Sequence, residues 1–404
     1  MATEAFRASS MAWRLYSGDE AIEQHLASEV ARAHAQRAFV ICSPSITRRT
    51  TVAARIAEAL GSRYAGVFDG IEKDSTYTSV SAAKAAAVEA GADLLIAVGG
   101  GSVIVATRAV AIFMAESASP FEVMTQYPEG KPAFSPRLLA PKPPIINVPT
   151  TPTSAMNRAG TGLKNDDLDH RMEYFDPKTR PHAIVWDTGA LMSAPPDLIR
   201  STATTVFAST VAGMAETDVN PLVDADRQHA FRLAHGAYPR VVEAVDDPAP
   251  RFDLCAAALL QNRAEDDGRR GRAPAPFADH YAVSTALHVR YPHVGQGEST
   301  SVVAATAMRL HPAPPEASAR SVAVALGLSR EGMGARDATL AIADAVEALY
   351  QRAGVPTRLR QLEIPRADIP LIARETVKNF NANAGARSEA DQVEDAIRLL
   401  EAAW

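Results

Sequence analysis

The sequence predicts an α/β protein in which a doubly wound parallel sheet precedes an all-helical domain. Three observations support this fold class. Short apolar runs alternate with helical segments in the first half of the 404-residue chain, one run enters a glycine-rich turn, and the pattern beyond about residue 190 is almost entirely helical. Alternating strands and helices are typical of a parallel sheet covered by helices. We therefore expect an α/β domain over residues 1–190 and a helical domain over residues 191–404.

The expected strands are short apolar runs, and they lie at residues 38–42, 64–68, 94–98, 144–148 and 183–186. The run at 94–98 is entirely apolar, which is typical of a parallel strand covered on both faces. The helices between the strands are expected at residues 48–60, 78–89 and 103–115. Those of the second half are expected at residues 202–216, 224–242, 254–264, 277–288, 301–310, 336–353 and 390–403. Residues 131–143 and 265–276 are expected to be loops.

Composition excludes several classes of protein. Hydrophobic residues make up 47% of the chain and charged residues 22%, a normal globular balance. The net charge of −6 disfavours a nucleic-acid or anionic-membrane partner. No apolar run reaches the roughly 18–20 residues of a membrane span, and the N-terminus lacks a signal-peptide core. Cys42 and Cys255 are far apart, so neither a disulfide framework nor a thiolate metal site is expected. We expect a cytoplasmic protein that binds a small molecule.

The run Gly99-Gly100-Gly101-Ser102 lies between the strand at 94–98 and the helix at 103–115. Glycines there leave backbone N–H groups open at a helix N-terminus, where they and the helix dipole bind a phosphate. A tight strand-to-helix turn also needs glycine for steric reasons alone. Thr150 and Thr151 follow the next strand at the same edge of the sheet, where ligands bind in open α/β sheets. Their hydroxyls suit phosphate or ribose oxygens, or else only cap a turn.

These two turns carry a resemblance to a known family. The run 96–102, followed by Val148-Pro149-Thr150-Thr151, resembles the iron-containing alcohol dehydrogenase superfamily, and within it the maleylacetate reductases. Residues 14–18, 60–68 and 354–362 are also similar to the reductases. The resemblance implies a Rossmann-like N-terminal domain, a helical C-terminal domain with the active site between them, and a homodimer. It also implies NAD or NADP as cofactor.

The resemblance suggests further cofactor contacts. Ser43 ends the first expected strand, where an Asp would repel a 2′-phosphate, so NAD and NADP both stay open. Arg108 keeps a cation where metal-dependent members have a lysine, and it is a candidate cofactor ligand.

The metal site implied by the resemblance is degenerate. Typical members hold a divalent metal with one Asp and three His, and the Asp and first His lie four residues apart on one helix face. Those two positions are Phe207 and Val211 here, whereas the other two histidines match His280 and His293. A further active-site histidine of the family falls on Ser284. A catalytic metal generally needs three protein ligands, so we expect none, as is understood for maleylacetate reductases.

His280, His293 and Ser284 are the candidate catalytic residues, because a histidine that titrates near neutrality can supply the proton that accompanies hydride addition. The alternative is that the histidines only cap helices or fill interfaces. Weaker candidates beside them are His288, Gln296 and Glu298.

By the resemblance, Arg171 falls where the reductases carry a basic pair, and Arg387 is similar in place to an arginine near their C-terminus. Both are expected to bind substrate carboxylates, since arginine pairs with them through two hydrogen bonds, and the alternative is that each is a surface arginine. Phe207 and Val211 are also expected in the substrate pocket. The sequence favours a metal-independent NAD(P)H-dependent reductase of a small oxo-acid or related carbonyl compound. The alternatives are a redox-neutral enzyme that performs elimination, hydrolysis or isomerisation through histidine acid–base chemistry, and a binding protein that retains only the scaffold.

Overall fold

The computed structural model describes residues 12–128, 131, 133–168, 170–217, 219–266, 277–278, 280–378 and 388–404. These residues form two compact units. Ala12–Pro195 is called the N-terminal unit, and the part from Pro196 to Trp404 is called the helical unit. The units divide between Pro195 and Pro196, whereas the sequence suggests a boundary after residue 190. Most of the loop expected at 265–276 lies outside the described residues.

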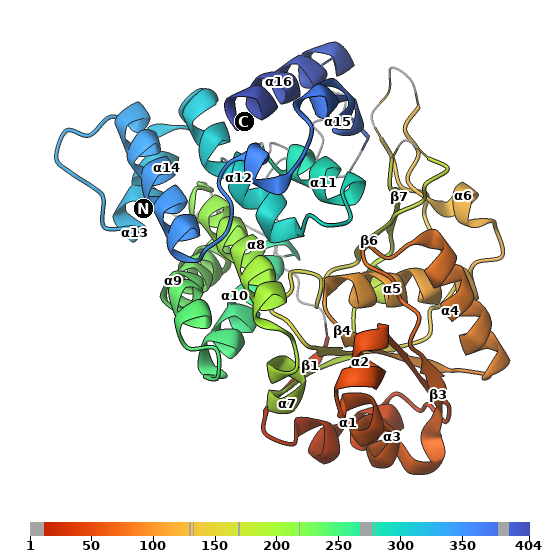
Figure 1. The fold of residues 1–404 in the computed structure, drawn as a ribbon. Coiled ribbons are helices and arrows are strands. Elements are labelled where there is room, and N and C mark those ends of the chain that lie inside the picture. Colours follow the sequence, from red (N-terminus) through yellow and green to blue (C-terminus); the bar gives the residue numbers. More distant parts are fainter. Residues whose placement is uncertain are drawn as a thin grey trace. The chain divides into compact units, whose positions relative to one another are not determined.

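The N-terminal unit alternates strands and helices along the chain (Figure 1). Its elements are β1 (Arg14–Gly18), α1 (Ala21–Arg32), β2 (Ala38–Cys42), α2 (Pro44–Arg49), α3 (Val52–Leu60), β3 (Tyr64–Phe68), α4 (Tyr77–Glu89), β4 (Leu94–Gly99), α5 (Gly101–Ala115), α6 (Pro120–Val123), β5 (Ile145–Pro149), β6 (Gly160–Leu163), β7 (Met172–Phe175), β8 (Ala183–Asp187) and α7 (Thr188–Met192).

In the described part of the chain, six of these strands form one sheet in the order β1-β8-β5-β4-β2-β3, and every neighbouring pair is parallel. Strands β6 and β7 form a separate antiparallel pair. The chain runs from β2 outward to β3 and then returns to β4 on the other side of β2. The sheet therefore has a topological switch point between β2 and β4, which is where open α/β sheets bind ligands. The expected fold class is confirmed.

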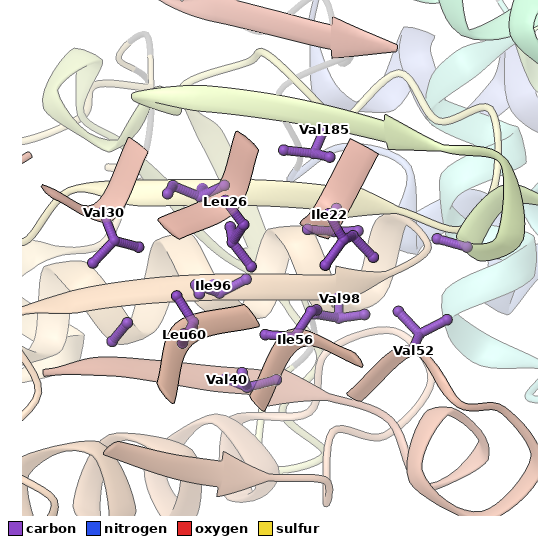
Figure 2. Close-up of a cluster of buried hydrophobic side chains, with 14 of the residues drawn as sticks. Ile22, Leu26, Val30, Val40, Val52, Ile56, Leu60, Ile96, Val98 and Val185 are labelled. Carbon is purple, nitrogen blue, oxygen red and sulfur yellow. The ribbon is translucent and has the colours of Figure 1, made fainter. Parts of the chain in front are cut away.

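The four inner strands β2, β4, β5 and β8 are buried at every residue. Alternate residues of a strand point to opposite sides, so both faces of this inner part of the sheet are covered. On one face, Ile22, Leu26 and Val30 of α1, with Ile56 and Leu60 of α3, pack on the strands (Figure 2). The strand residues in this cluster include Val40, Ile96, Val98 and Val185. Each fully buried aliphatic side chain stabilises the fold by about 1.5–3 kcal/mol relative to exposure.

Helix α5 packs on β4 and β5 and also contacts β6. Its buried side chains surround it on all sides, as is typical of a helix enclosed in a core. The Thr161 hydroxyl donates to the Val105 carbonyl at 2.6 Å and joins β6 to this helix. Because α5 begins at Gly101, its enclosure holds the glycine turn in place.

The expected helix at 48–60 is in fact two helices. Thr50 is extended, with φ −135° and ψ 164°, and its hydroxyl donates to the Ile46 carbonyl at 2.6 Å. This local hydrogen bond competes with helix continuation and separates α2 from α3. Helix α1, strands β6 and β7 and the short helices α6 and α7 are further elements that the sequence pattern did not predict.

The helical unit contains helices along its whole described length. They are α8 (Pro196–Met214), α9 (Pro221–Glu243), α10 (Ala249–Asp266), α11 (Tyr281–Arg290), α12 (Gln296–Leu310), α13 (Glu316–Ala325), α14 (Ala335–Arg352), α15 (Ile369–Glu375) and α16 (Glu389–Ala402). The central helix is α8, which contacts α9, α10, α12 and α13. None of the described helices is long and apolar enough to cross a membrane.

Two helix starts in this unit differ from the expectation. Phe277 has a left-handed backbone with φ 66°, so the helix expected from residue 277 begins only at Tyr281. Helix α12 begins at Gln296 rather than at residue 301, because Gly297 lets its first turn approach α8 closely. The N–H of Gly297 donates to the Ser201 hydroxyl of α8 at 3.1 Å.

Candidate functional site

The glycine turn leaves β4 and enters α5 at the switch point of the sheet. Gly99 has φ +155°, and a Cβ there would lie 2.7 Å from Cγ2 of Val103, so glycine is required. A Cβ at Gly100 would lie 3.2 Å from Oγ1 of Thr151, and one at Gly101 would lie 3.2 Å from Oγ1 of Thr153. The backbone at Gly100 and Gly101 therefore lies directly beside the hydroxyl groups of Thr151 and Thr153, with no side chain between them.

Thr150 and Thr151 extend β5 beside the glycine turn. The N–H of Thr150 donates to the Gly99 carbonyl at 3.1 Å, which ties the two turns together. Thr151 is fully buried, and its hydroxyl has no hydrogen-bond partner among the residues that the structure describes. An unpaired buried hydroxyl costs about 1–3 kcal/mol. The N–H groups in the first turn of α5 also lack acceptors within the helix, so an anion here would satisfy both kinds of donor.

Ser102 joins this turn to a strained loop after β3. Its hydroxyl accepts from the Asp74 N–H at 3.1 Å, and its carbonyl accepts from the Ser75 hydroxyl at 2.6 Å. Asp74 and Ser75 both have left-handed backbones, with φ 61° and 54°. Such conformations cost about 1–3 kcal/mol each and cluster at functional sites. The Ser102 hydroxyl, expected to bind the cofactor, thus holds this loop against the start of α5.

Charged groups surround Asp74. Burial raises the pKa of its carboxyl group, and Lys73, Arg171 and Lys164 oppose that rise. Arg171, expected to bind substrate, donates through Nη2 to the Gly162 carbonyl at 2.5 Å. Its buried Nε–H has no acceptor in the part of the chain that is described. Asp74, Lys73 and Lys164 were not predicted from the sequence, because only the tertiary fold brings this loop to α5.

The two other expected cofactor residues differ in position. Ser43 ends β2 next to β4, and its hydroxyl lies 2.9 Å from that of Ser45. Arg108 is buried two turns along α5 and donates through Nη1 to the carbonyls of Ala155 and Arg158 at 2.8 and 2.5 Å. Burial, together with the smaller effects of the nearby Arg158 and Arg180, lowers its pKa to about 9. These contacts of Arg108 secure the loop at residues 155–158, and its expected role as a cofactor ligand stays a prediction.

In the helical unit, His280 lies just before α11 and is 1% exposed. Neither ring nitrogen has a hydrogen-bond partner among the described residues. Its pKa is lowered to about 4, chiefly by burial, with a smaller opposite effect of the Phe277 backbone and a further small lowering by His311 included in that value. The ring is therefore neutral at pH 7, which disfavours the expected proton-donor role in this environment.

His280 and Ser284 lie one helical turn apart, and the Ser284 N–H donates to the His280 carbonyl at 2.8 Å, whereas His293 lies apart from both. His293 follows the far end of α11, about 15 Å along a ten-residue helix, is exposed, and its Nε2 lies 2.9 Å from the Leu362 carbonyl oxygen. Ser284 is buried, and its hydroxyl lies 3.0 Å from those of Ser299 and Thr300 on α12. This contact identifies it as part of the α11–α12 interface.

The weaker candidates also make structural contacts. His288 is buried, with Nδ1 2.9 Å from the Ser284 carbonyl oxygen. Glu298 accepts from the Ser201 hydroxyl at 2.6 Å. The Gln296 carbonyl accepts from the hydroxyls of Ser299 and Thr300 at 3.0 and 2.8 Å.

Phe207 and Val211 are core residues of the helical unit. The Phe207 ring is fully buried and stacks on Tyr238 of α9, with centroids 4.9 Å apart. Val211 is 1% exposed. Their expected place in a substrate pocket stays a prediction, and their contacts in the structure are core contacts within the helical unit. Among the described residues, no three His, Cys, Asp or Glu side chains group as a metal site would require. Arg387, another expected substrate ligand, lies outside the described residues.

Comparisons with known proteins agree with this architecture. Residues 13–188 match the family model of iron-containing alcohol dehydrogenases, and residues 201–404 match that of the C-terminal part of the Fe-containing alcohol dehydrogenase family. The chain is 24% identical to lactaldehyde reductase of Escherichia coli K12 over 396 residues, covering 94% of this chain and 95% of the relative. It is also 24% identical to maleylacetate reductase of Burkholderia cepacia, covering 93% and 91%.

A solved structure has the same fold. The sulfoacetaldehyde reductase of Bifidobacterium kashiwanohense in complex with NAD+ has a TM-score of 0.76 at 19% identity, covering 98% of this chain and 99% of that one. The family matches together span both units of the protein. The chain therefore belongs to the iron-containing alcohol dehydrogenase family.

Proposed function

We propose that this protein is an NAD(P)H-dependent reductase of a small oxo-acid or related carbonyl compound and that it works without a catalytic metal. The observation that carries the proposal is the glycine turn at the N-terminus of α5, beside the buried and unpartnered hydroxyl of Thr151. Relatives are named lactaldehyde reductase and maleylacetate reductase, and both names denote reduction of a carbonyl compound.

The N-terminal unit fits a dinucleotide. The first-turn N–H groups of α5, with Gly100, Gly101 and Thr151, would hold its pyrophosphate, and Ser43 at the end of β2 would lie towards a ribose. NAD(P)H supplies a hydride when bound. Ser43 puts no carboxylate at that position, so we propose that either NADH or NADPH is accepted.

The first test uses the Thr151 hydroxyl. Thr151→Val should leave the free energy of unfolding unchanged or raise it slightly, because the hydroxyl makes no hydrogen bond among the described residues. The affinity for NADH should nevertheless fall about tenfold, since the variant loses one hydrogen bond to the ligand. Urea denaturation and NADH fluorescence titration measure the two quantities.

The matched control is Thr107→Val. Thr107 is also fully buried in this unit, but its hydroxyl already donates to the Val103 carbonyl at 2.9 Å. That variant should lose a little stability and keep its NADH affinity. A Thr151→Val protein that binds NADH and NADPH as tightly as the parent would refute the assignment of this hydroxyl.

The residues present do not fit the family's metal. Phe207 has no donor atom and faces Tyr238 of α9. His280 and His293, the two histidines that match metal ligands of the family, lie at opposite ends of α11, and Nε2 of His293 faces a carbonyl oxygen. Three protein ligands are generally needed for a firmly held catalytic ion, and the described side chains offer no such group. The proposed mechanism therefore contains no step at a metal.

Chelation tests this point. Protein dialysed against EDTA should retain its NADH-dependent reductase activity, and adding Fe²⁺ or Zn²⁺ should change the rate by less than about twofold, because no catalytic step depends on Lewis-acid polarisation. Elemental analysis should find far less than one metal ion per chain. A rate that collapses on chelation and returns with one equivalent of metal would contradict the proposal.

Two residues are proposed to act on the substrate, one as a carboxylate ligand and one as the proton donor. We propose that the unpartnered Nε–H of Arg171 contacts a substrate carboxylate. We also propose that the exposed His293 supplies the proton, because His280 is enclosed and neutral. NADH oxidation with small 2- and 3-oxo-acids tests the reaction class. Turnover that continues after all nucleotide has been removed would favour the redox-neutral alternative instead.

A further inference from the structure

A groove lies on the helical unit, away from α11 and α12. It has a volume of about 840 Å³ and is lined by residues of α9 and α13 and by Met214 at the end of α8. Small-molecule pockets typically measure about 300–1,000 Å³. The apolar part of the lining includes Phe231, Val324 and Ala325. None of these groups takes part in the proposed reaction.

Two stacked rings, those of Phe231 and His235, line one wall of the groove. The rings of Phe231 and His235 are stacked, with centroids 5.5 Å apart and an interplanar angle of 9°. The His235 ring also lies 6.4 Å from that of Phe207, which stacks on Tyr238. Burial lowers the pKa of His235, so at neutral pH this imidazole is an uncharged, flat surface. Such a wall suits a planar aromatic ligand.

The charged lining of the groove is cationic. Arg232 of α9 and Arg320 of α13 both line it, and no carboxylate is among the described lining residues. Arg320 pairs with Glu316 at 2.7 Å, but both side chains are largely exposed, so this pair is weak. Arg232 contacts the His229 ring, with Nη2 2.7 Å from Nδ1. An anion could therefore recruit both guanidinium groups.

We propose that this groove is a binding site for a small aromatic anion, whose rings pack on Phe231 and His235 and whose carboxylate or sulfonate meets Arg232 and Arg320. The stacked wall, the volume and the excess of positive charge all match that class. The proposal does not depend on the reductase function, because every residue involved belongs to α8, α9 or α13.

Gly236 allows a sharp test. It lines the groove on an exposed face of α9, and a Cβ at this position would meet no atom within 4 Å. Gly236→Leu should fill the groove without disturbing the helix, because leucine has a higher helix propensity than glycine. Gly236→Ala is the matched control, since it adds one methyl group only. Arg320→Gln tests the charge separately.

The probe is 2-naphthalenesulfonate, titrated by isothermal calorimetry in the presence and absence of saturating NADH. We expect the parent and Gly236→Ala to bind with Kd near 0.1 mM, on the order expected for a ligand of this size. Gly236→Leu should weaken binding at least about tenfold, Arg320→Gln about fivefold, and uncharged 2-naphthol should bind more weakly than the sulfonate.

Three results would overturn the proposal. The first is an affinity that Gly236→Leu leaves unchanged. The second is displacement of the probe by NADH, which would place it at the glycine turn. The third is a change of oligomeric state for Gly236→Leu in sedimentation velocity, which would show that a second copy of the chain covers the groove. Loss of reductase activity would not bear on any of these measurements.

Discussion

Replacing Gly100 with valine will lower the affinity for NADH at least about 100-fold while the protein stays folded. Gly100 caps the N-terminus of α5 with φ −81° and ψ −165°, an extended backbone that any residue adopts. The obstacle is space, since even a Cβ would lie 3.2 Å from Oγ1 of Thr151. Valine adds two further methyl groups where a phosphate would approach the helix N–H groups. Losing two charge-assisted hydrogen bonds, at about 1.5–3 kcal/mol each, accounts for the size of the effect.

Gly334→Val is the matched control for this change. Gly334 also caps a helix, α14, with φ −73° and ψ 164°, and a Cβ there would meet nothing within 4 Å. Both variants therefore exchange a capping glycine for valine in the same backbone conformation. Fluorescence titration should show normal NADH binding for Gly334→Val and almost none for Gly100→Val. Equal affinities would mean that the glycine turn serves only the strand-to-helix geometry.

Gly297→Ala will destabilise the helical unit by about 3 kcal/mol. A Cβ at Gly297 would lie 2.1 Å from the Ser201 carbonyl oxygen, so α12 and α8 would have to separate. The obstacle is backbone rather than a flexible side chain, which places the cost at the upper end of the 1–3 kcal/mol typical of overpacking. Separation would also lengthen the hydrogen bond from the Gly297 N–H to the Ser201 hydroxyl.

Urea denaturation measures this loss, with Gly236→Ala as control. That glycine also lies within a helix, but its surroundings are open, so alanine should stabilise the protein by about 0.5–1 kcal/mol through helix propensity. The two alanine substitutions should thus have opposite signs. If Gly297→Ala unfolded at the same urea concentration as the parent, this would contradict the close contact of α12 with α8 at Gly297.

Local pattern was enough to predict much of the N-terminal unit. The strands at 38–42 and 64–68 lie where expected, because each is a short apolar run ended by turn residues. The glycine turn was also apparent, since a strand–Gly-Gly-Gly–helix run is a contiguous feature. The helix predicted at 48–60 was wrong near its start, because the Thr50 hydroxyl donates to the Ile46 carbonyl, an interaction that periodicity does not include.

The sequence by itself therefore determined the fold class, the glycine turn between a strand and a helix, and the absence of donor atoms at Phe207 and Val211. Only the tertiary structure decided which neighbours the individual side chains contact. It placed Phe207 against Tyr238, engaged Arg108 with loop carbonyls, and enclosed His280 away from water. It also brought the Asp74 loop to Ser102, which lies 28 positions further along the chain. The physical reason is that residue type sets which contacts are possible, whereas burial and charge depend on neighbours distant in sequence.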